Sequence, residues 1–367
     1  MTSPESSILN YLDDDVLGVI CGFLQSTLED TSSRRSPKLV EGVQKSPFDS
    51  LSRTCKRLRT HSLPFIFKHF MLYCFGNNPW DRAMAKLKDW NPDYSSYVQE
   101  IHLRFELGYK EDPEPFAEKL PDTLAKVLSR ISTSSSHLYK FSCIINEDRA
   151  HLFRDAFSRH NLAFPTVKQL IVGPYNDFAV KLCPNTDYLS VNDWVWLHSK
   201  KAGPSREHSF NLIKEARTLP HLKVFIIMER WSEKLLEALY DAVPRIQILV
   251  IPASILMDFE NFVMHLSRFR HVEILSIPCA SQLRLGFNPP RCGNIYMGPR
   301  GGEVRKRVEQ QGQAAQERAA TEIFDKCPLL KELWFDGHVK VTQKDYDGLG
   351  KRKRELEYDS ESSCPWI

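Results

Sequence analysis

The sequence predicts an α/β fold in which a short N-terminal helical module precedes a solenoid of alternating strands and helices. Three observations lead to this prediction. Two segments near the N-terminus carry apolar residues at helical spacing, a short apolar pattern recurs along the rest of the chain, and helix-period segments lie between its copies. We therefore expect the helical module at residues 8–70, the solenoid at residues 71–350 and a charged tail at residues 351–367.

Composition fits a folded chain without an extreme charge. The chain has 367 residues, of which 42% are hydrophobic, and its 49 basic and 46 acidic side chains give a net charge of +3. This length is enough for two domains or for one elongated array. The small net charge counts against a nucleic-acid partner, because nucleic-acid binding depends on a basic field.

The spacing of the cysteines and the length of the apolar stretches indicate the cellular compartment of the protein. Nine cysteines are spread along the chain without a Cys-x-x-Cys pair, which is typical of a reduced environment, cytoplasmic and/or nuclear. The N-terminus has neither the basic start nor the apolar core of a signal peptide. No apolar run approaches the ~18 residues of a membrane span, so we expect no membrane partner.

The first helix is predicted over residues 12–24. Asp13, Asp14 and Asp15 stand where carboxylates cap free amides and suit the positive end of the helix dipole. An apolar stripe follows at helical spacing. Its members are Val16, Leu17, Ile20, Phe23 and Leu24.

A second helix is predicted over residues 51–59, with Leu51, Cys55 and Leu58 on its apolar side. The residues between the two helices, 25–47, are rich in Ser, Thr, Arg and Lys and contain two prolines. That composition predicts a flexible insertion. On periodicity alone, the module could equally be an ordinary helical subdomain packed on the rest of the chain.

This stretch resembles an F-box, the module by which substrate receptors dock on the Skp adaptor of SCF-type cullin–RING ubiquitin ligases. The matching residues are Leu12, Asp15, Val16, Leu17, Ile20, Leu24, Leu51, Cys55, Lys56, Leu58 and Arg59, followed by a Leu63-Pro64-x-x-Phe67 tail similar to that of fungal F-box proteins. Asp13 stands where the family has proline, and the loop between the helices is longer than usual. The resemblance implies an adaptor-binding surface formed by Leu12, Val16, Leu17, Ile20, Leu24, Leu51, Cys55 and Leu58.

The repeated pattern has the form Φ-x-x-Φ-x-Φ, where Φ is an apolar residue. Its copies are Val98/Ile101/Leu103, Leu138/Phe141/Cys143, Val167/Leu170/Val172, Leu222/Phe225/Ile227, Ile246/Leu249/Ile251, Val272/Leu275/Ile277 and Leu330/Leu333/Phe335, with a weaker one at Thr186/Leu189/Val191. A proline often comes just before a copy, as at Pro165 and Pro220, and would stop a helix and start a strand.

Helix-period segments alternate with these runs. They include residues 120–131, 235–243, 259–266 and 303–324, with a loop insertion expected at 278–302. A strand followed by a helix at roughly 20 to 30 residues per repeat predicts a curved solenoid with parallel strands inside the arc. This region resembles an irregular leucine-rich repeat, although the family's Asn or Cys after the last strand leucine is missing.

The solenoid predicts a substrate-binding face, because side chains of a strand alternate between its two faces. The predicted substrate-binding residues are His102, Arg104, Ser190, Asn192, Met228, Ser276, Trp334 and Asp336, with Ser142, Ile226 and Val250 on the same face. Trp334 is the predicted exposed anchor, since Trp is enriched in binding hot spots. The alternative is that such residues are core, or are packed against loops or a C-terminal tail.

The sequence predicts no catalytic residue, no metal ligand and no cofactor. Gly298–Glu303 lacks the Gly-Lys-Ser/Thr ending of a phosphate loop, and no zinc-ligand spacing or Gly-x-Ser-x-Gly turn occurs. We therefore expect a non-catalytic protein.

The functional expectation is the substrate-recognition subunit of an SCF-type ubiquitin ligase. Its partners would be a Skp-family adaptor with its cullin complex and a substrate protein that the sequence does not identify. One alternative is a leucine-rich-repeat-like scaffold, outside any ligase, with a degenerate F-box. Another is a nuclear nucleic-acid-associated protein that uses the basic run 351–354 and the cluster at Arg300 and 305–307.

Overall fold

The computed structural model describes residues 13–33, 47–74, 79–105, 119–191, 206–287, 289, 296–297, 300–346, 353–359 and 363–366. The chain divides into two compact units. The first comprises Met1–Leu103, Leu107–Lys140 and Ala156–Leu162, and the second Arg104–Glu106, Phe141–Asp155 and Ala163–Ile367. In the described ranges, no helix is both long and apolar enough to span a membrane.

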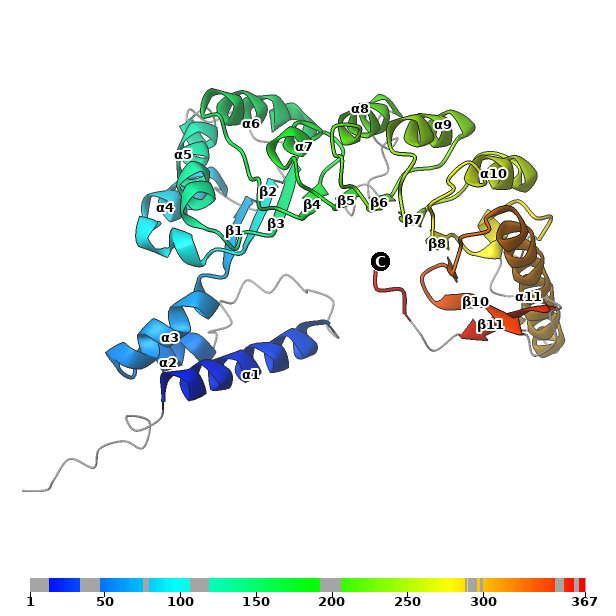
Figure 1. The fold of residues 1–367 in the computed structure, drawn as a ribbon, viewed down its shortest axis with the longest axis horizontal. Helices are drawn as coiled ribbons and strands as arrows, with labels where there is room; N and C mark the ends of the chain where they lie inside the picture. The colour runs from blue at the N-terminus through cyan, green and yellow to red at the C-terminus, as the bar shows by residue number, and fades with distance from the viewer. Residues whose placement is uncertain are drawn as a thin grey trace, which may run out of the picture. The chain divides into compact units, whose positions relative to one another are not determined.

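Helices and strands alternate along most of the chain (Figure 1). The helices are α1 (Asp14–Ser33), α2 (Pro47–Ser52), α3 (Lys56–Ile66), α4 (Pro79–Lys88), η2 (Pro92–Tyr97), α5 (Lys119–Ser134), α6 (Glu147–Arg159), α7 (Phe178–Leu182), α8 (Arg206–Ala216), α9 (Glu233–Ala242), α10 (Phe259–Leu266), η3 (Ala280–Gln282) and α11 (Gly301–Lys326). The strands are β1 (His69–Cys74), β2 (Glu100–Phe105), β3 (Lys140–Ile145), β4 (Gln169–Val172), β5 (Tyr188–Val191), β6 (Val224–Ile227), β7 (Ile248–Val250), β8 (Ile274–Ile277), β9 (Glu332–Phe335), β10 (Val339–Tyr346) and β11 (Lys353–Asp359). In the described part of the chain, these strands lie in chain order in one sheet.

The predicted α/β class with parallel strands is confirmed. Every apolar run of the repeated pattern contains a strand, and each of these strands begins two residues after the first apolar position of its run, as β6 begins at Val224 after Leu222. Neighbouring strands from β4 to β9 pair in parallel. The helix predicted over 303–324 is α11, and the helices predicted near 120–131, 235–243 and 259–266 are α5, α9 and α10.

The second apolar position of each copy is held in register across the second unit. The ladder runs through Leu170, Leu189, Phe225, Leu249, Leu275 and Leu333. All six are 1% exposed or less. Helices α8, α9 and α10 lie on the outer side of strands β5 to β8 (Figure 1). Because strand side chains alternate, the residues between these ladder positions face the opposite side of the sheet.

Two helix boundaries differ from the prediction. Helix α1 continues to Ser33 instead of ending at Leu24, because no glycine or proline interrupts 25–33. The first part of the predicted insertion 25–47 is therefore helical, while 34–46 lie outside the described residues. The single helix predicted over 51–59 is split into α2 and α3.

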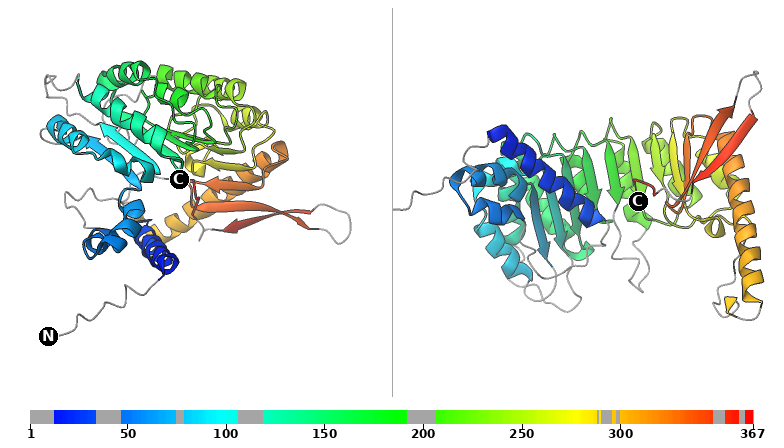
Figure 2. Two further views of the ribbon diagram at one scale, coloured as in Figure 1. Left: turned by 60° about the vertical axis from the view of Figure 1, so that its left-hand side comes forward. Right: turned by 90° about the horizontal axis from the view of Figure 1, so that it is seen from below.

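Within the predicted charged tail, Lys353–Asp359 forms strand β11, which pairs antiparallel with β10. The sequence of β11 alternates charged residues with Leu356 and Tyr358, a strand-like period that its high charge conceals. Figure 2 shows β10 and β11 side by side, next to α11. Burial raises the pKa of Tyr358 to about 12, and the nearby carboxylate of Glu317 in α11 adds to this shift.

The chain reverses direction between β9 and β10 at Asp336 and Gly337. Both residues have positive φ, 52° and 71°, and the His338 N–H donates to the Phe335 carbonyl at 3.1 Å. An Asp-Gly pair with two positive φ angles is the preferred tight hairpin turn. The predicted insertion at 278–302 contains η3 and enters α11 at Gly301, and 288, 290–295 and 298–299 lie outside the described residues.

Candidate docking surfaces

The N-terminal module has a small apolar core. Leu17 and Cys21 of α1 are 2% and 1% exposed, and Leu58 of α3 is 3% exposed. Phe48 of α2 stacks on Phe65 of α3, with ring centroids 4.9 Å apart. Helix α3 packs against both α1 and α2. One side of α1 is therefore used to hold the module together.

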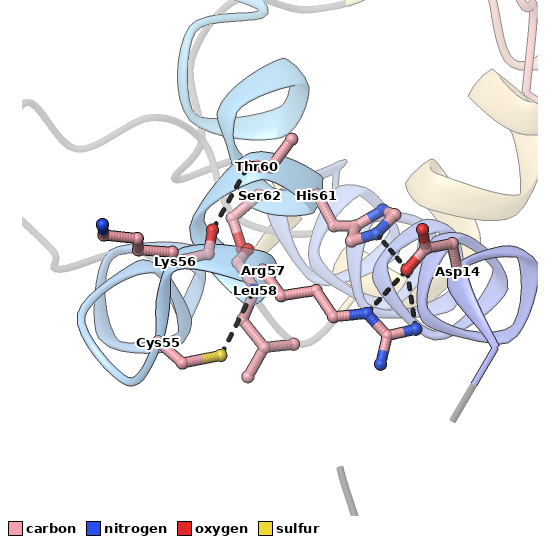
Figure 3. A network of polar contacts seen from close by, with 8 residues as sticks. All are labelled: Asp14, Cys55, Lys56, Arg57, Leu58, Thr60, His61 and Ser62. Carbon is pink, nitrogen blue, oxygen red and sulfur yellow. Dashed lines mark hydrogen bonds and ion pairs between the residues drawn. The ribbon is translucent and has the colours of Figure 1, made fainter. Parts of the chain in front are cut away.

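A charged contact fixes the first turn of α1 to α3 (Figure 3). The Asp14 carboxylate accepts hydrogen bonds from Arg57, at 2.6 Å from Nη2 and 2.7 Å from Nε, and lies 3.1 Å from His61 Nε2. The bonds from Arg57 and then His61 lower the pKa of Asp14 below its usual range. The exposed carboxylate therefore sets the orientation of α1 more than its stability, because exposed ion pairs contribute little.

Cys55 caps the start of α3, where its Sγ accepts a hydrogen bond from the Leu58 N–H at 3.5 Å (Figure 3). Arg59 Nε donates to the Ser52 carbonyl at 3.1 Å, which ties α3 back to the end of α2. The Ser62 hydroxyl donates to the Leu58 carbonyl within α3. Cys55 is therefore a capping residue rather than part of an apolar contact.

The opposite side of α1 exposes large apolar side chains. Val16, Val19, Ile20 and Phe23 are 43%, 72%, 40% and 71% exposed, and they recur at the i, i+3, i+4, i+7 spacing of one helix face. We call this set the α1 stripe. A Cβ added at Gly22 would meet no atom within 4 Å, so the surface beside the stripe is open.

The structure divides the predicted adaptor-binding residues. Val16 and Ile20 belong to the exposed α1 stripe, whereas Leu17 and Leu58 are buried in the core of the module. Leu24 and Leu51 are half-buried, Cys55 is the α3 cap, and Leu12 lies outside the described residues. Val19 and Phe23 complete the stripe and were absent from the predicted surface. The i+3 spacing of Val19 from Val16 is the signal that could have identified it.

The second candidate surface is a face of the sheet in the second unit. Register places Ser190, Ile226, Val250, Ser276 and Trp334 in one cross-strand row. Tyr188, Val224 and Ile248 form the next row on the same side. We call these eight residues the strand face. The predicted residues Ser190, Ser276 and Trp334 are thus brought together as the alternation of strand side chains indicates.

A later segment of the chain, Ser363–Trp366, covers part of the strand face. Trp366 packs against the cluster of Val224, Ile226 and Val250 together with Tyr188 and Ile248. The ring centroids of Trp366 and Tyr188 are 6.3 Å apart. Figure 1 places this end of the chain, marked C, on the side of the strands opposite α8 to α10.

Cys364 anchors this segment. Its N–H donates to the Gly337 carbonyl at 2.8 Å, and its side chain is 5% exposed. Burial raises the pKa of the Cys364 thiol, while the neighbouring Ser276 hydroxyl acts in the opposite direction. Burial likewise raises the pKa of Tyr188, and Cys364 adds to this effect. The buried Cys364 side chain and its main-chain hydrogen bond therefore hold the segment in place.

Trp334 is not the exposed anchor that the sequence predicted. It is 3% exposed, its indole N–H donates to a Glu332 carboxylate oxygen at 3.2 Å, and the Lys340 ammonium lies 5.5 Å from the ring centroid. Lys340 also pairs with Glu332 at 2.7 Å. Ser276, 1% exposed, is buried as well. The physical reason is non-local, since β10 pairs beside β9 and the Ser363–Trp366 segment covers part of the strand face, and the sequences of the strands themselves give no sign of either.

The other predicted substrate residues are not gathered on this face. Asp336 is exposed in the β9–β10 turn, and Met228 lies beyond the end of β6, where it lines a small pocket with Pro174, Leu212 and Glu229. His102 belongs to the first unit, Arg104 is half-buried in β2, and Asn192 lies outside the described residues.

His102 belongs to a charge cluster around Glu100 that sequence reasoning missed, because its members are far apart in the chain. Glu100, 6% exposed, accepts from the Tyr139 hydroxyl at 2.5 Å and lies 3.0 Å from His102 Nε2 and 3.4 Å from Lys140 Nζ. Burial alone would raise the pKa of Glu100, but hydrogen bonds from His102, His69 and Tyr139 together hold it far below its usual range.

The atoms of His69, Glu100 and His102 that could bind a metal lie within 4.8 Å of one another, as do those of Glu233, Glu237 and His265. In the first group, Lys140 and Tyr139 already neutralise and hydrogen-bond the carboxylate that a metal ion would need. We therefore interpret it as a structural ion-pair network between neighbouring strands.

Neither models of protein families nor curated protein sequences match this chain. The α1 stripe and the strand face are accordingly the features from which a function can be inferred.

Proposed function

We propose that the chain is the substrate-recognition subunit of an SCF-type cullin–RING ubiquitin ligase. In this proposal, the N-terminal module is an F-box-like domain that docks on a Skp-family adaptor. The strands and helices that follow form an irregular leucine-rich-repeat-like solenoid that binds a substrate protein. The single observation that carries the proposal is the α1 stripe, four large apolar side chains exposed on one face of a small helical module.

The α1 stripe supports docking on energetic grounds. Contiguous apolar side chains on a soluble protein mark interaction sites, and fully burying a Val or Phe side chain contributes about 1.5–3 kcal/mol. Val19 and Phe23 are the two most exposed of the four, so their burial in an interface would contribute the most free energy. Packing of Leu17 and Cys21 in the module core and the Asp14–Arg57 contact orient α1 before it binds, which lowers the ordering cost of docking.

The proposed mechanism is proximity. An adaptor bound at the α1 stripe and a substrate held by the second unit would be linked through one chain. The link raises the effective concentration of a substrate lysine near the ligase. Ubiquitin transfer itself would be carried out by other subunits, and the proposal assigns this chain no bond-making residue.

The test is co-expression with a Skp-family adaptor followed by size-exclusion chromatography of the pair. We expect a stoichiometric complex with the wild-type chain and loss of at least about 100-fold in affinity for Val19→Glu/Phe23→Glu, because two charges would be placed in an apolar interface. Gly22→Ala, on the same helix but off the stripe, is the matched control and should bind as the wild type does.

Unchanged adaptor binding by the double variant would refute the α1 stripe as the docking surface. If the wild-type chain were well folded but did not bind the adaptor, the alternative would be favoured, an interaction scaffold with a degenerate F-box. The specific observation behind that alternative is Asp13, which stands at the position of the F-box proline.

A further inference from the structure

We propose that the strand face is a binding site for a peptide segment with an aromatic anchor, and that Ser363–Trp366 is its intramolecular occupant. A partner peptide of the same chemistry would bind by displacing this segment. The inference deepens the recognition part of the proposed function and rests on it only in treating the partner as a substrate.

The segment is bound in the manner of a peptide ligand. One main-chain hydrogen bond, from the Cys364 N–H to the Gly337 carbonyl, fixes its position. Burial alternates along it, with Ser363 and Pro365 exposed, Cys364 buried and Trp366 half-buried. Main-chain bonding combined with pockets for alternate side chains is a recurring mode of peptide recognition.

The strand face offers matched chemistry at the two anchor positions. Around Trp366 it is apolar and aromatic, since Val224, Ile226 and Val250 form its floor and Tyr188 lies beside the ring. Around Cys364 it is polar, since the Ser276 hydroxyl and the Glu332 carboxylate both act on the thiol. The ligand class is therefore a peptide with a large aromatic residue two positions after a small, weakly polar one.

The two sides of the same strands differ in how they are covered. On the helix side, along which α8 to α10 lie (Figure 1), ladder residues such as Leu249 and Phe225 are 0% exposed. On the strand face, the ring that covers Val224 and Ile226 is itself only half-buried. A half-buried indole is replaceable by another aromatic side chain, because the exchange conserves most of the buried apolar area.

Removing the anchor tests the proposal in the full-length protein. The probe is a fluorescein-labelled peptide Ser-Cys-Pro-Trp, the sequence of residues 363–366, and the readout is fluorescence polarisation. Trp366→Ala should bind the peptide at least about tenfold more tightly than the wild type does, because a tethered segment competes at an effective concentration on the order of millimolar.

Two controls make the result specific. The peptide with Trp replaced by Ala should not bind the Trp366→Ala variant. Met264→Ala, which removes a side chain 54% exposed on α10, should leave peptide binding as weak as in the wild type.

Three results would overturn the proposal. If the Trp366→Ala protein folded but did not bind the peptide, the strand face would not be a site for this peptide. If the variant and the wild type bound the peptide with equal affinity, the peptide would bind outside the strand face. Loss of the fold in Trp366→Ala, seen by circular dichroism, would make the segment part of the core. The assay contains no adaptor, so its failure leaves the docking proposal for the α1 stripe standing, and failure of adaptor binding leaves this site standing.

Discussion

The α1 stripe and the strand face are both apolar surfaces, but only the first is exposed. Val19 and Phe23 of α1 are more than two-thirds exposed, whereas Val224, Ile226 and Val250 on the strand face are at most 6% exposed. The strand face is covered by Trp366 from more than a hundred residues further along the chain. An apolar row in a sequence therefore locates a face but does not say whether another part of the same chain already covers it.

The largest expected effect separates the two sides of α1. Leu17→Glu places a charge in the module core and should unfold the module, a loss of about 4 kcal/mol or more. Val19→Glu, two residues away and exposed, should change stability by no more than about 0.5 kcal/mol. Urea unfolding followed by circular dichroism measures both. Equal losses would mean that Val19 contributes to the module core as Leu17 does.

A smaller effect compares Trp334 of the strand face with Trp366, which covers that face. Trp334→Ala should cost about 3–5 kcal/mol, because Trp334 is almost fully buried between Glu332 and Lys340. Trp366→Ala should cost only about 1 kcal/mol, since its ring is half-buried. Denaturant midpoints of the two variants check the order, and the reverse order would make Trp366 the structural residue.

The smallest effect concerns the contact that orients the α1 stripe. The pKa of Asp14 is lowered from its ordinary 3.8 by hydrogen bonds from Arg57 and His61. The ionised contact therefore contributes fully above pH 3.8, and its contribution is lost as the pH falls through the lowered folded-state pKa.

Asp14→Asn should accordingly lower the urea midpoint slightly at about pH 6, and the difference from the wild type should shrink as the pH falls below 3.8. Arg53→Gln is a control, because Arg53 is not among the residues that contact Asp14. A difference that persists at low pH would show that the Asp14 charge is not its source.

The repeated strands could be predicted from the sequence because their determinants are local. In each copy, two apolar residues separated by one position fit a strand buried on its helix side, as Leu275 and Ile277 of β8 do. The start of α1 also has a local signal in the sequence, since three aspartates precede the first apolar residue. These features need no knowledge of the rest of the molecule.

The division of each apolar set into buried and exposed members could not be predicted. Val16 and Leu17 are neighbours with the same hydrophobic character, and only the position of α3 decides that Leu17 is the buried one. Likewise, Ser276 has the pattern of a binding-face residue until Cys364 is placed beside it. Both outcomes depend on contacts between segments distant in sequence, for which no local signal exists.

The tight turn at Asp336 and Gly337 has a consequence for how the sheet ends. It switches the last strands from parallel to antiparallel, so another strand–helix unit could not continue the ladder from β9. The outermost strand becomes β11, with the sequence Lys-Arg-Glu-Leu-Glu-Tyr-Asp. An edge strand that carries both basic and acidic residues discourages strands of other molecules from pairing with it. The hairpin therefore protects the sheet against edge-to-edge aggregation.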